Sequence, residues 1–313
     1  MKKLFPLVIF LLASSLVHAI DIPDYVAEKI APHTYVIHGP KGLPSPENKG
    51  FMNNPVFVIT EAGVVVIDPG SSVYTGRMVL RQIRKLSNKR VTHVLNTHIH
   101  GDHWLGNQAF AEIYPHAQIM AHPDMITQAE AGADQFWIRM MSDLTRGATD
   151  GTRAIIPTKV VDEAHEFKTG GLSFRILAPR QAHSGTDIMI HILEDSVMLT
   201  GDNVFHQRIG RMDDATFRGN INACDVASKS GAKVFVPGHG PTGDITIVKE
   251  FRNYLSTLYE SVKELYDEGL SDYQMKPKVV ERLKDYHKWD GFEHEVGKHI
   301  SLALLEAEKA MFE

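Results

Sequence analysis

The chain reads NTHIHGDH at residues 96–103, directly after an apolar strand candidate. Four side chains of this stretch, His98, His100, Asp102 and His103, are of types that bind metal ions. A strand that ends in a tight turn can point the first two histidines to one side while Asp102 and His103 face a second position. Burying four such groups without a metal would leave several polar groups unpaired. The stretch therefore predicts part of a metal centre at a strand end.

Three further segments place a ligand-type side chain among Gly or Pro residues near a predicted strand. His183 stands in AHSGTD, Asp202 in TGDN directly after a strand, and His239 in PGHGP at a strand end. Gly and Pro suit the sharp turns that aim such side chains. We therefore expect the three groups to converge with the first cluster in a shallow groove at one sheet edge.

In this order the residues resemble the metallo-β-lactamase superfamily, which has an HxHxDH motif, a later His, a bridging Asp and a final His. The resemblance covers residues 34–243, and all seven ligand positions are filled. It implies an α/β (α+β) fold, an αββα sandwich, here with a C-terminal helical extension. It also implies one metal on His98, His100 and His183, a second on Asp102, His103 and His239, and Asp202 as the bridge. Asp68, in IDPG, matches the motif that supports the ligand loop without binding the metal.

Two positions narrow the branch of the superfamily. Zinc β-lactamases with a thiolate ligand have Cys where this chain has Asp202, and the Asp is similar to glyoxalase II-like and other broad hydrolase branches. The lysine that one lactamase branch places three residues later is replaced by Phe205. The export signal described below favours lactamase-like or periplasmic groups, including metallohydrolases linked to quinoprotein systems.

Nitrogen and oxygen ligands without sulfur suit two zinc ions, and would also accept iron or manganese. Two such ions would share a water and bring its pKa to about 7, so that hydroxide is available at neutral pH. The resemblance thus implies a zinc-dependent hydrolase whose bridged hydroxide attacks the carbonyl of an ester, thioester, amide or lactam. Asp102 would bind the second metal and orient the hydroxide.

Three alternatives stay open. The first is a β-lactamase proper. The second is an oxidoreductase that resembles the persulfide dioxygenases, which have one iron. The third is a noncatalytic binding protein that metal stabilises. Metal analysis separates the second from the hydrolase, and the effect of Asp102→Asn separates the third.

A small-molecule substrate would meet two irregular segments and a few polar groups. Residues 39–54, rich in Gly, Pro and Asn, predict a long loop, and residues 132–152 predict a helical insertion that contains Trp137. Either segment would serve as a lid, although Trp and Met at helical spacing also suit a core. His206, Arg208 and Arg211 follow the Asp202 strand and would either reach an anionic substrate or lie on a solvated surface.

The first 19 residues resemble a secretory signal peptide. Two lysines precede an apolar run that is shorter than the roughly 20 residues a membrane span needs. The small residues around Ala19 predict cleavage there, which leaves residues 20–313 as the exported, periplasmic domain without a stable membrane anchor. The only cysteine, Cys224, permits no internal disulfide and suits a buried apolar position.

The composition fits an ordinary soluble globular protein. The formal net charge is -5, and no basic block supports nucleic-acid binding. Residue patterns predict strands at 34–38, 55–60, 63–68, 91–96, 119–121, 172–177, 187–193, 196–200 and 233–237. They predict helices at 77–86, from 245 to about Gly269, and at 302–311. We expect the helices of about 245–313 to pack on the same fold, with a separate binding domain as the alternative; the oligomeric state is left open.

Overall fold

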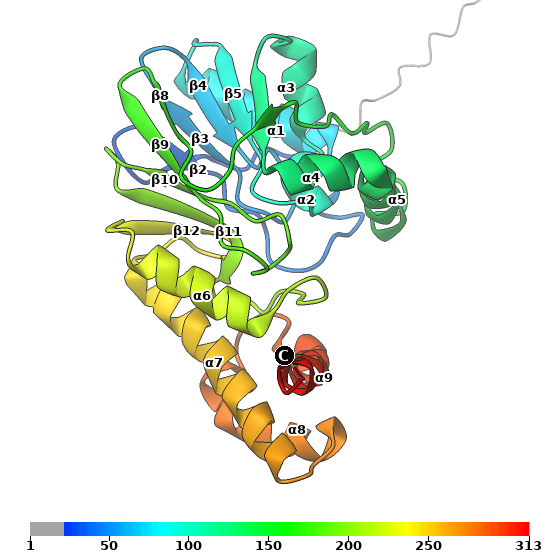
Figure 1. The fold of residues 1–313 in the computed structure, drawn as a ribbon. Coiled ribbons are helices and arrows are strands. Elements are labelled where there is room, and N and C mark those ends of the chain that lie inside the picture. The colour runs from blue at the N-terminus through cyan, green and yellow to red at the C-terminus, as the bar shows by residue number, and fades with distance from the viewer. Residues whose placement is uncertain (1–21, 313) are drawn as a thin grey trace, which may run out of the picture.

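Two β-sheets form the centre of the computed structural model, which describes residues 22–312 (Figure 1). The seven-stranded sheet contains, in spatial order, β1 (Glu28–Lys29), β2 (Thr34–Val36), β3 (Val56–Ile59), β4 (Val64–Ile67), β5 (Val91–Leu95), β6 (Gln118–Ala121) and β7 (Lys159–Val160). Its strands pair antiparallel from β1 to β4 and parallel from β4 to β7. The second sheet contains β12 (Val234–His239), β11 (Val197–Phe205), β10 (Met189–Ile192), β9 (Leu172–Leu177) and β8 (Glu166–Thr169). Only β11 and β12 are parallel in it.

Helices cover the outer faces of both sheets. They are α1 (Val73–Leu86), α2 (Gly101–Trp104), α3 (Asn107–Ile113), α4 (Pro123–Gln128), η1 (Ala129–Ala133), α5 (Asp134–Leu144), α6 (Phe217–Ser228), α7 (Ile245–Asp267), α8 (Asp272–Arg282), η2 (Lys284–Tyr286) and α9 (Phe292–Ala310). Helices α1 and α3 pack on the first sheet, and α6 and α7 pack on the second. The predicted αββα sandwich is therefore confirmed.

Side chains of β4 alternate between two apolar clusters, one between the sheet and α1 and one between the two sheets. Val64 and Val66 belong to the apolar cluster under α1, whereas Val65 and Ile67 belong to the cluster between the sheets. Successive side chains of a strand point to opposite faces, so a continuous apolar run is needed where both faces are buried. All four residues are buried.

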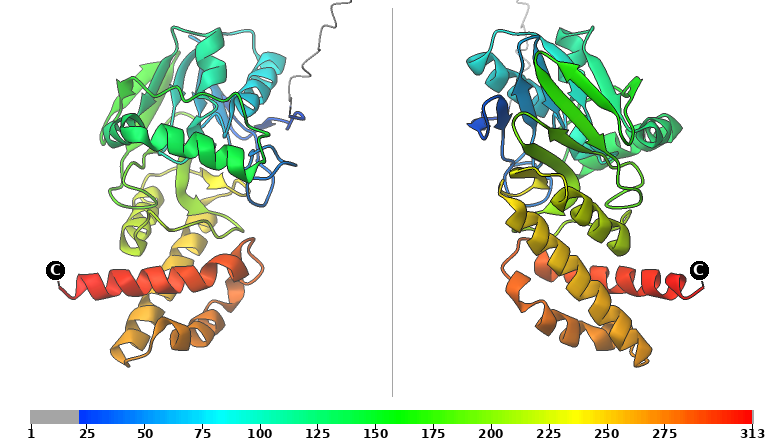
Figure 2. Two further views of the ribbon diagram at one scale, coloured as in Figure 1. Left: turned by 90° about the vertical axis from the view of Figure 1, so that its right-hand side faces the viewer. Right: turned by 60° about the vertical axis from the view of Figure 1, so that its left-hand side comes forward.

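The C-terminal helices pack on the second sheet through one apolar cluster. Phe251, Leu255 and Leu258 of α7 and Ile300 of α9 share this cluster with Phe235 of β12. The helices then extend away from the sheets, and α9 crosses beside α7 (Figure 2). The C-terminal helices and the second sheet therefore share one apolar core.

One helix boundary and one whole helix in this region differ from the sequence prediction. Helix α9 begins at Phe292, well before residue 302, and α8 was not predicted at all. Pro277 lies inside α8 and removes a backbone hydrogen-bond donor, so the local sequence does not favour a helix there. Burial of Met275 and Val279 in the apolar cluster compensates for this loss.

Strand β11 is longer than the sequence prediction of residues 196–200. It runs to Phe205, and all nine of its residues are buried. Asp202 consequently lies inside the strand and not after it, which corrects the prediction. A register shift beside Gly201 lets the strand continue past the polar residues along β12.

The two irregular segments of the sequence prediction are a loop and a helix followed by turns. Residues 39–54 contain no helix or strand, and residues 132–152 contain α5 followed by turns. Helix α1 begins at Val73, four residues before the predicted start, because the Ser72 hydroxyl accepts a hydrogen bond from the Thr75 backbone N–H. None of the helices in residues 22–312 is both long and apolar enough to cross a membrane. The predicted signal peptide, residues 1–19, lies outside the described residues.

Candidate metal centre

The seven predicted ligands come together where the two sheets meet. His98 and His100 lie in the loop after β5, and Asp102 and His103 lie in the short helix α2 that follows. His183 lies in the loop between β9 and β10, Asp202 inside β11, and His239 at the end of β12. All are buried except His100, which is partly exposed. The side chains form two groups, each with its ligand atoms within 4.8 Å of one another.

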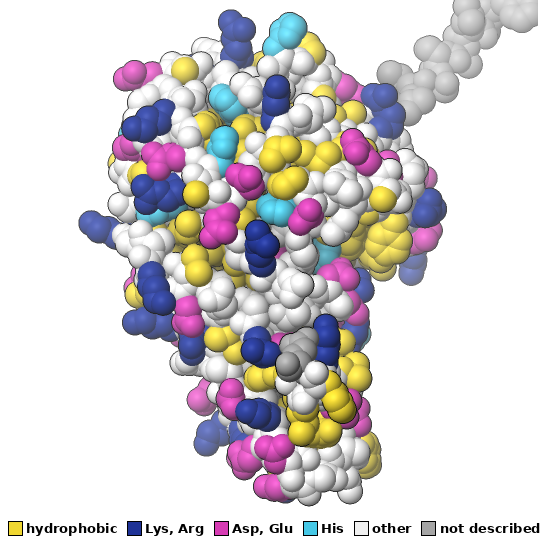
Figure 3. Space-filling model, in the orientation of Figure 1, with side chains coloured by type: hydrophobic (Ala, Val, Ile, Leu, Met, Phe, Trp, Pro, Cys, Tyr) yellow, Lys and Arg dark blue, Asp and Glu magenta, His cyan; other side chains and the backbone are white. Residues whose placement is uncertain are grey.

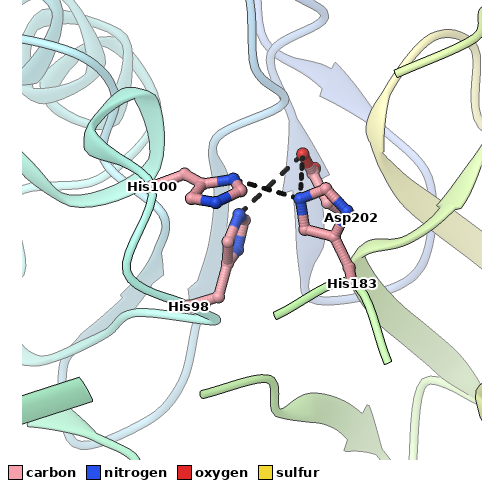
Figure 4. A group of neighbouring side chains, drawn as sticks. All are labelled: His98, His100, His183 and Asp202. Carbon is pink, nitrogen blue, oxygen red and sulfur yellow. Dashed lines mark hydrogen bonds and ion pairs between the residues drawn. The ribbon is translucent and has the colours of Figure 1, made fainter. Parts of the chain in front are cut away.

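The first group contains His98, His100, His183 and Asp202 (Figure 4). Oδ2 of Asp202 lies 3.8 Å from Nε2 of His98 and 3.5 Å from Nε2 of His183. Nε2 of His183 lies 3.0 Å from Nδ1 of His100. Ligand atoms about 2.0–2.1 Å from a tetrahedral zinc ion would be about 3.4 Å apart. The spacing of the group therefore fits one such ion.

The second group contains Asp102, His103 and His239. Oδ2 of Asp102 lies 3.1 Å from Nε2 of His239 and 3.5 Å from Nε2 of His103. The two imidazole Nε2 atoms are 3.3 Å apart. These three distances also fit the edges of a tetrahedron around one ion.

Asp202 lies between the two groups. Besides its contacts in the first group, its Oδ2 lies 3.4 Å from Nε2 of His239, and its Oδ1 lies 3.2 Å from Nε2 of His103. A carboxylate in this position has an oxygen atom for each group. This is the place that the sequence predicted for the bridging residue.

Several buried polar atoms of the centre have no hydrogen-bond partner in the part of the chain that the structure describes. They include Nε2 of His98, Nδ1 of His183 and Oδ1 of Asp202. Unpaired polar atoms in a buried site are costly, and a bound cation would satisfy the lone pairs among them. With nitrogen and oxygen donors alone, the residues fit zinc, and also iron or manganese.

Hydrogen bonds from outside the centre orient the second group of ligands. Nδ1–H of His103 donates to Oδ2 of Asp68 at 2.8 Å, and Nδ1–H of His239 donates to the Met52 carbonyl at 2.8 Å. Each bond fixes the tautomer that leaves the Nε2 lone pair facing the centre. Asp68 thus occupies the supporting place that the sequence predicted, whereas the role of the Met52 carbonyl had no sequence signal.

His100 has a supporting carboxylate that the sequence reading missed. Its Nε2 lies 3.0 Å from Oδ2 of Asp214, and its Nδ1 faces His183. Asp214 lies in the loop before α6, 114 residues further along the chain. A separation of that length leaves no local pattern that would have identified the pair.

Glycine permits the close approach of backbone to the bridging carboxylate. A Cβ atom at Gly238 would collide with Oδ1 of Asp202, and one at Gly201 would lie 2.9 Å from Thr97. Gly201 also has a φ of 52°, in the left-handed region that favours glycine. Side chains at these two positions would displace β11 from the centre.

Burial and neighbouring charges shift the pKa values of several titratable groups of the centre. Burial lowers the pKa of His98 well below its usual range, and lowers that of His183 to about 3. Both imidazoles are consequently neutral, as ligands must be. Burial disfavours the charge on Asp202, but His239 and His103 hold the pKa of its carboxyl well below the usual range. The carboxylate is thus ionised and able to bind a cation.

The centre opens into a pocket of about 510 Å³. Residues 39–54 line it with Leu43, Pro44 and Met52, and α5 lines it with residues that include Trp137. The Trp137 ring also contacts His100, with ring centroids 4.9 Å apart, and Met141 beside it is buried. The two predicted segments therefore form pocket walls, and α5 is at the same time part of an apolar core cluster.

Of the three polar residues that the sequence analysis placed after the Asp202 strand, two line the pocket and one does not. Arg208 and Arg211 line the pocket, whereas His206 is not among the lining residues. Its Nδ1 lies 2.8 Å from the Pro241 carbonyl, and its Nε2 lies 3.9 Å from Oε2 of Glu250. His206 is thus turned toward α7 and the loop that follows β12.

The C-terminal helix α9 also contributes to the pocket. Its residues His294, Glu295 and Lys298 form part of the wall. Figure 2 shows α9 crossing below α5, with the loop of residues 39–54 beside them. Helix α9 thus belongs both to the apolar core and to the pocket wall. Cys224, as predicted, is buried away from the pocket, and burial raises the pKa of its thiol.

Known proteins resemble this chain in both sequence and fold. The "Probable metallo-hydrolase" of Methanocaldococcus jannaschii is 26% identical over 201 residues, which cover 62% of this chain and 91% of the relative. A linear primary-alkylsulfatase of a Pseudomonas species is 23% identical over 256 residues, 69% of this chain and 48% of that protein. The structure of a sec-alkylsulfatase from a Pseudomonas species matches with a TM-score of 0.70 at 14% identity, over 90% of this chain and 50% of that one.

The family model described as "Metallo-beta-lactamase superfamily" matches residues 48–239. These residues contain every ligand of the two groups and the supporting Asp68. The chain therefore belongs to the metallo-beta-lactamase superfamily.

Proposed function

We propose that the protein is a zinc-dependent hydrolase that cleaves an ester, thioester, amide or lactam at its carbonyl carbon. The observation that carries the proposal is the place of Asp202, whose carboxylate oxygens lie within 3.8 Å of ligand nitrogens in both groups. Two zinc ions held there would supply hydroxide at neutral pH and polarise a carbonyl.

Residues of the chain would supply the remaining functions. Asp102 lines the pocket and belongs to the second group, so its carboxylate is placed to accept a proton from a water molecule on the pocket side. His100 and His183 also line the pocket, so a substrate carbonyl has access to the first group. Cys224 offers no competing thiol nucleophile, because its Sγ is buried against the Asn203 carbonyl.

The direct test is turnover by zinc-loaded Asp102→Asn protein. We expect kcat to fall by at least about a hundredfold, since one group that touches the reacting water is lost. Thioesters, lactones, β-lactams and phosphodiesters form the substrate panel. Wild-type turnover restricted to β-lactams would identify a β-lactamase proper.

Two other outcomes would contradict hydrolysis. Protein purified without added metal that contained about one iron and no zinc would favour the persulfide-oxidising alternative. An Asp102→Asn protein that kept its full biological effect would favour the noncatalytic binding protein. Circular dichroism of the variant must match the wild type, so that unfolding does not imitate a loss of catalysis.

A second candidate reaction is hydrolysis of an alkyl sulfate ester. The observation in its favour is the sequence relative named as a linear primary-alkylsulfatase, which matches 69% of this chain. Octyl sulfate and an octanoyl thioester, offered at equal concentrations, distinguish the reactions because the apolar chains are of similar length. Release of inorganic sulfate without thioester cleavage would replace the carbonyl proposal.

The exported, periplasmic location is a separate proposal. It rests on residues 1–19 of the sequence alone. N-terminal sequencing of protein recovered from the periplasm should begin at Ile20. A full-length N-terminus in a membrane fraction would instead indicate a retained anchor.

A further inference from the structure

Arg208 is a buried arginine in the pocket wall. It follows β11 by three residues, is 8% exposed, and lines the same pocket as Asp102 and His239. Its backbone lies against that of Asp290, where the Ile209 N–H donates to the Asp290 carbonyl at 2.7 Å. The position of the side chain is therefore set by tertiary structure and not by a free surface loop.

The guanidinium of Arg208 has no hydrogen-bond or ion-pair partner among residues 22–312. Most of the Arg208 side chain is buried, but its guanidinium nitrogens keep contact with solvent, because none of them is among the fully buried unpaired atoms of the described residues. The five N–H donors of a guanidinium match the oxygens of a carboxylate, sulfate or phosphate. A cation that lines the pocket without a protein partner is available to an anionic group of a ligand.

Other charged side chains of the pocket wall have partners. Arg211 and Lys298 both pair with Asp213. The carboxylate of Asp214 lies 3.0 Å from His100, and that of Glu295 lies 2.7 Å from His294.

Another part of the pocket wall is apolar. Phe136, Met140 and Leu144 recur every fourth residue on α5, so they lie on one helix face, and all three line the pocket. Phe136 is 47% exposed and Leu144 is 45% exposed. Leu43 and Pro44 of the 39–54 loop line the same pocket.

The apolar wall is accessible from outside. In Figure 3 apolar side chains gather where Figure 1 draws α5. Large apolar side chains held in contact with water beside a polar centre commonly mark a binding surface. This wall suits an alkyl, acyl or aromatic group.

We propose that the substrate is an amphiphilic anion, with its carboxylate, sulfate or phosphate group on Arg208 and its apolar part against α5. The inference rests on the proposed hydrolysis, since it names the class of molecule on which this centre would act. The anion and the apolar part are recognised by different walls, so each can be tested by itself.

Calorimetric titration of the zinc-loaded protein measures the binding, and an assay of inorganic sulfate after each titration detects any cleavage of octyl sulfate. The probes are octanoate and octyl sulfate, with octanol and octylammonium as neutral and cationic counterparts of equal chain length, and acetate as an anion without the chain. We expect the two octyl anions to bind at least about tenfold more tightly than each of the other three probes. Equal binding of octanol and octyl sulfate would overturn the inference.

Variants assign the two halves of the ligand. Arg208→Gln should weaken octyl sulfate binding about tenfold and leave octanol binding unchanged, while Arg208→Lys should recover part of the loss. Phe136→Ser should weaken both octyl probes and leave acetate unchanged. Arg175→Gln, an exposed arginine of β9 outside the pocket, is the matched control and should bind all probes as the wild type does.

The variants must keep the wild-type zinc content and thermal midpoint, and Arg208→Met serves where Arg208→Gln does not fold. Octyl sulfate binding that is unaffected by Arg208→Gln or by Arg208→Met would overturn the assignment of the anion.

The two proposals fail differently. If the anions bind as expected but no member of the hydrolysis panel is cleaved, the proposed function fails and the ligand class stands. If neutral esters are cleaved at the same rate as their anionic counterparts, with equal KM, the hydrolase stands and the amphiphilic anion fails.

Discussion

The Asp68 carboxylate accepts a hydrogen bond from Nδ1 of His103 at 2.8 Å, and the same carboxylate accepts from the backbone N–H and the hydroxyl of Thr97. One side chain thus joins the end of β4 to the loop that carries the first histidines. The backbone of Asp68 has a φ of 50°, which is unusual for a residue other than glycine. This backbone conformation is maintained at a position that orients a proposed metal ligand.

Asp68→Asn should therefore weaken zinc binding about 10- to 100-fold. The amide presents an N–H group to Nδ1 of His103, which favours the tautomer that has its proton on Nε2. Chelator competition measures the affinity. Asp285→Asn, on the exposed surface, is the control and should bind zinc as the wild type does. An unchanged affinity in Asp68→Asn would mean that the carboxylate does not orient His103.

The bridging place of Asp202 predicts different metal contents for two alanine variants. Asp102→Ala should keep the first metal and lose the second, because Asp102 contacts only the second group. Asp202→Ala should fall below one metal per chain, because its carboxylate lies against both groups. Elemental analysis after dialysis measures the content, with two zinc ions expected in the wild type. Equal contents in the two variants would contradict a bridge.

The side chain of Asp290 connects two pocket walls. Its carboxylate accepts from the Gly42 N–H at 3.2 Å, while its backbone N–H donates to the Gln207 carbonyl at 3.0 Å. Asp290→Ala removes the first bond and keeps the second. A bond worth about 0.5–1.5 kcal/mol predicts a two- to tenfold rise in KM, with kcat and zinc content unchanged. Steady-state kinetics on the substrate found by the panel tests this. A fall in kcat at constant KM would place Asp290 in the chemistry instead.

His299 predicts a pH-dependent part of the stability. Burial lowers its pKa to about 4, from 6.5, and its ring lies between the Tyr254 hydroxyl at 2.8 Å and the Gly210 carbonyl at 3.0 Å. Between pH 6.5 and 4 the unfolded chain binds a proton that the folded chain does not. Stability is therefore lost as the pH falls through this range, by up to roughly 3 kcal/mol for this group.

The test for His299 compares urea unfolding at pH 7 and pH 5. His299→Gln should be less stable than the wild type at pH 7 but should lose less stability on acidification. Both proteins are measured with the same zinc content, because acid also releases metal. An identical pH dependence in the two proteins would show that His299 does not contribute.

Leu258 tests whether the C-terminal helices unfold together with the sandwich. It is fully buried in the cluster that joins α7 and α9 to β12. Leu258→Ala should cost about 2–5 kcal/mol of unfolding free energy and shift one cooperative transition. Leu305→Ala on α9, where the side chain is 61% exposed, should stay within about 0.5 kcal/mol of the wild type. Two separate transitions in the wild type would indicate an independent helical domain.

Local sequence patterns did not predict helix α8 or the full length of strand β11. The sequence predicted the beginning of β11 but not its continuation through polar residues, because pairing with β12 overrides the local preference. Helix α8 contains Pro277 and depends on the burial of Met275 and Val279 against other helices. Both features are decided by contacts with distant residues.

The sequence by itself determined the identity and order of the seven ligand-type residues and a two-sheet sandwich with helices outside. These follow from chemistry and periodicity that are local: HxHxDH lies within six residues, and strand alternation repeats every second residue. The family resemblance, which extends over residues 34–243, adds the grouping of the ligands, the supporting place of Asp68 and the αββα order of the layers.

Only the tertiary structure decided which partners orient the ligands and what surrounds the pocket. Asp214 contacts His100 although the two residues are 114 positions apart in the chain. Helix α9 lines the pocket, although the metal ligands all lie between the end of β5 and the end of β12. The unpaired guanidinium of Arg208 is likewise invisible in sequence, where it follows a strand together with His206 and Arg211 as one polar run. The physical reason is that burial and pairing are properties of packed neighbours, which a chain brings together only when it folds.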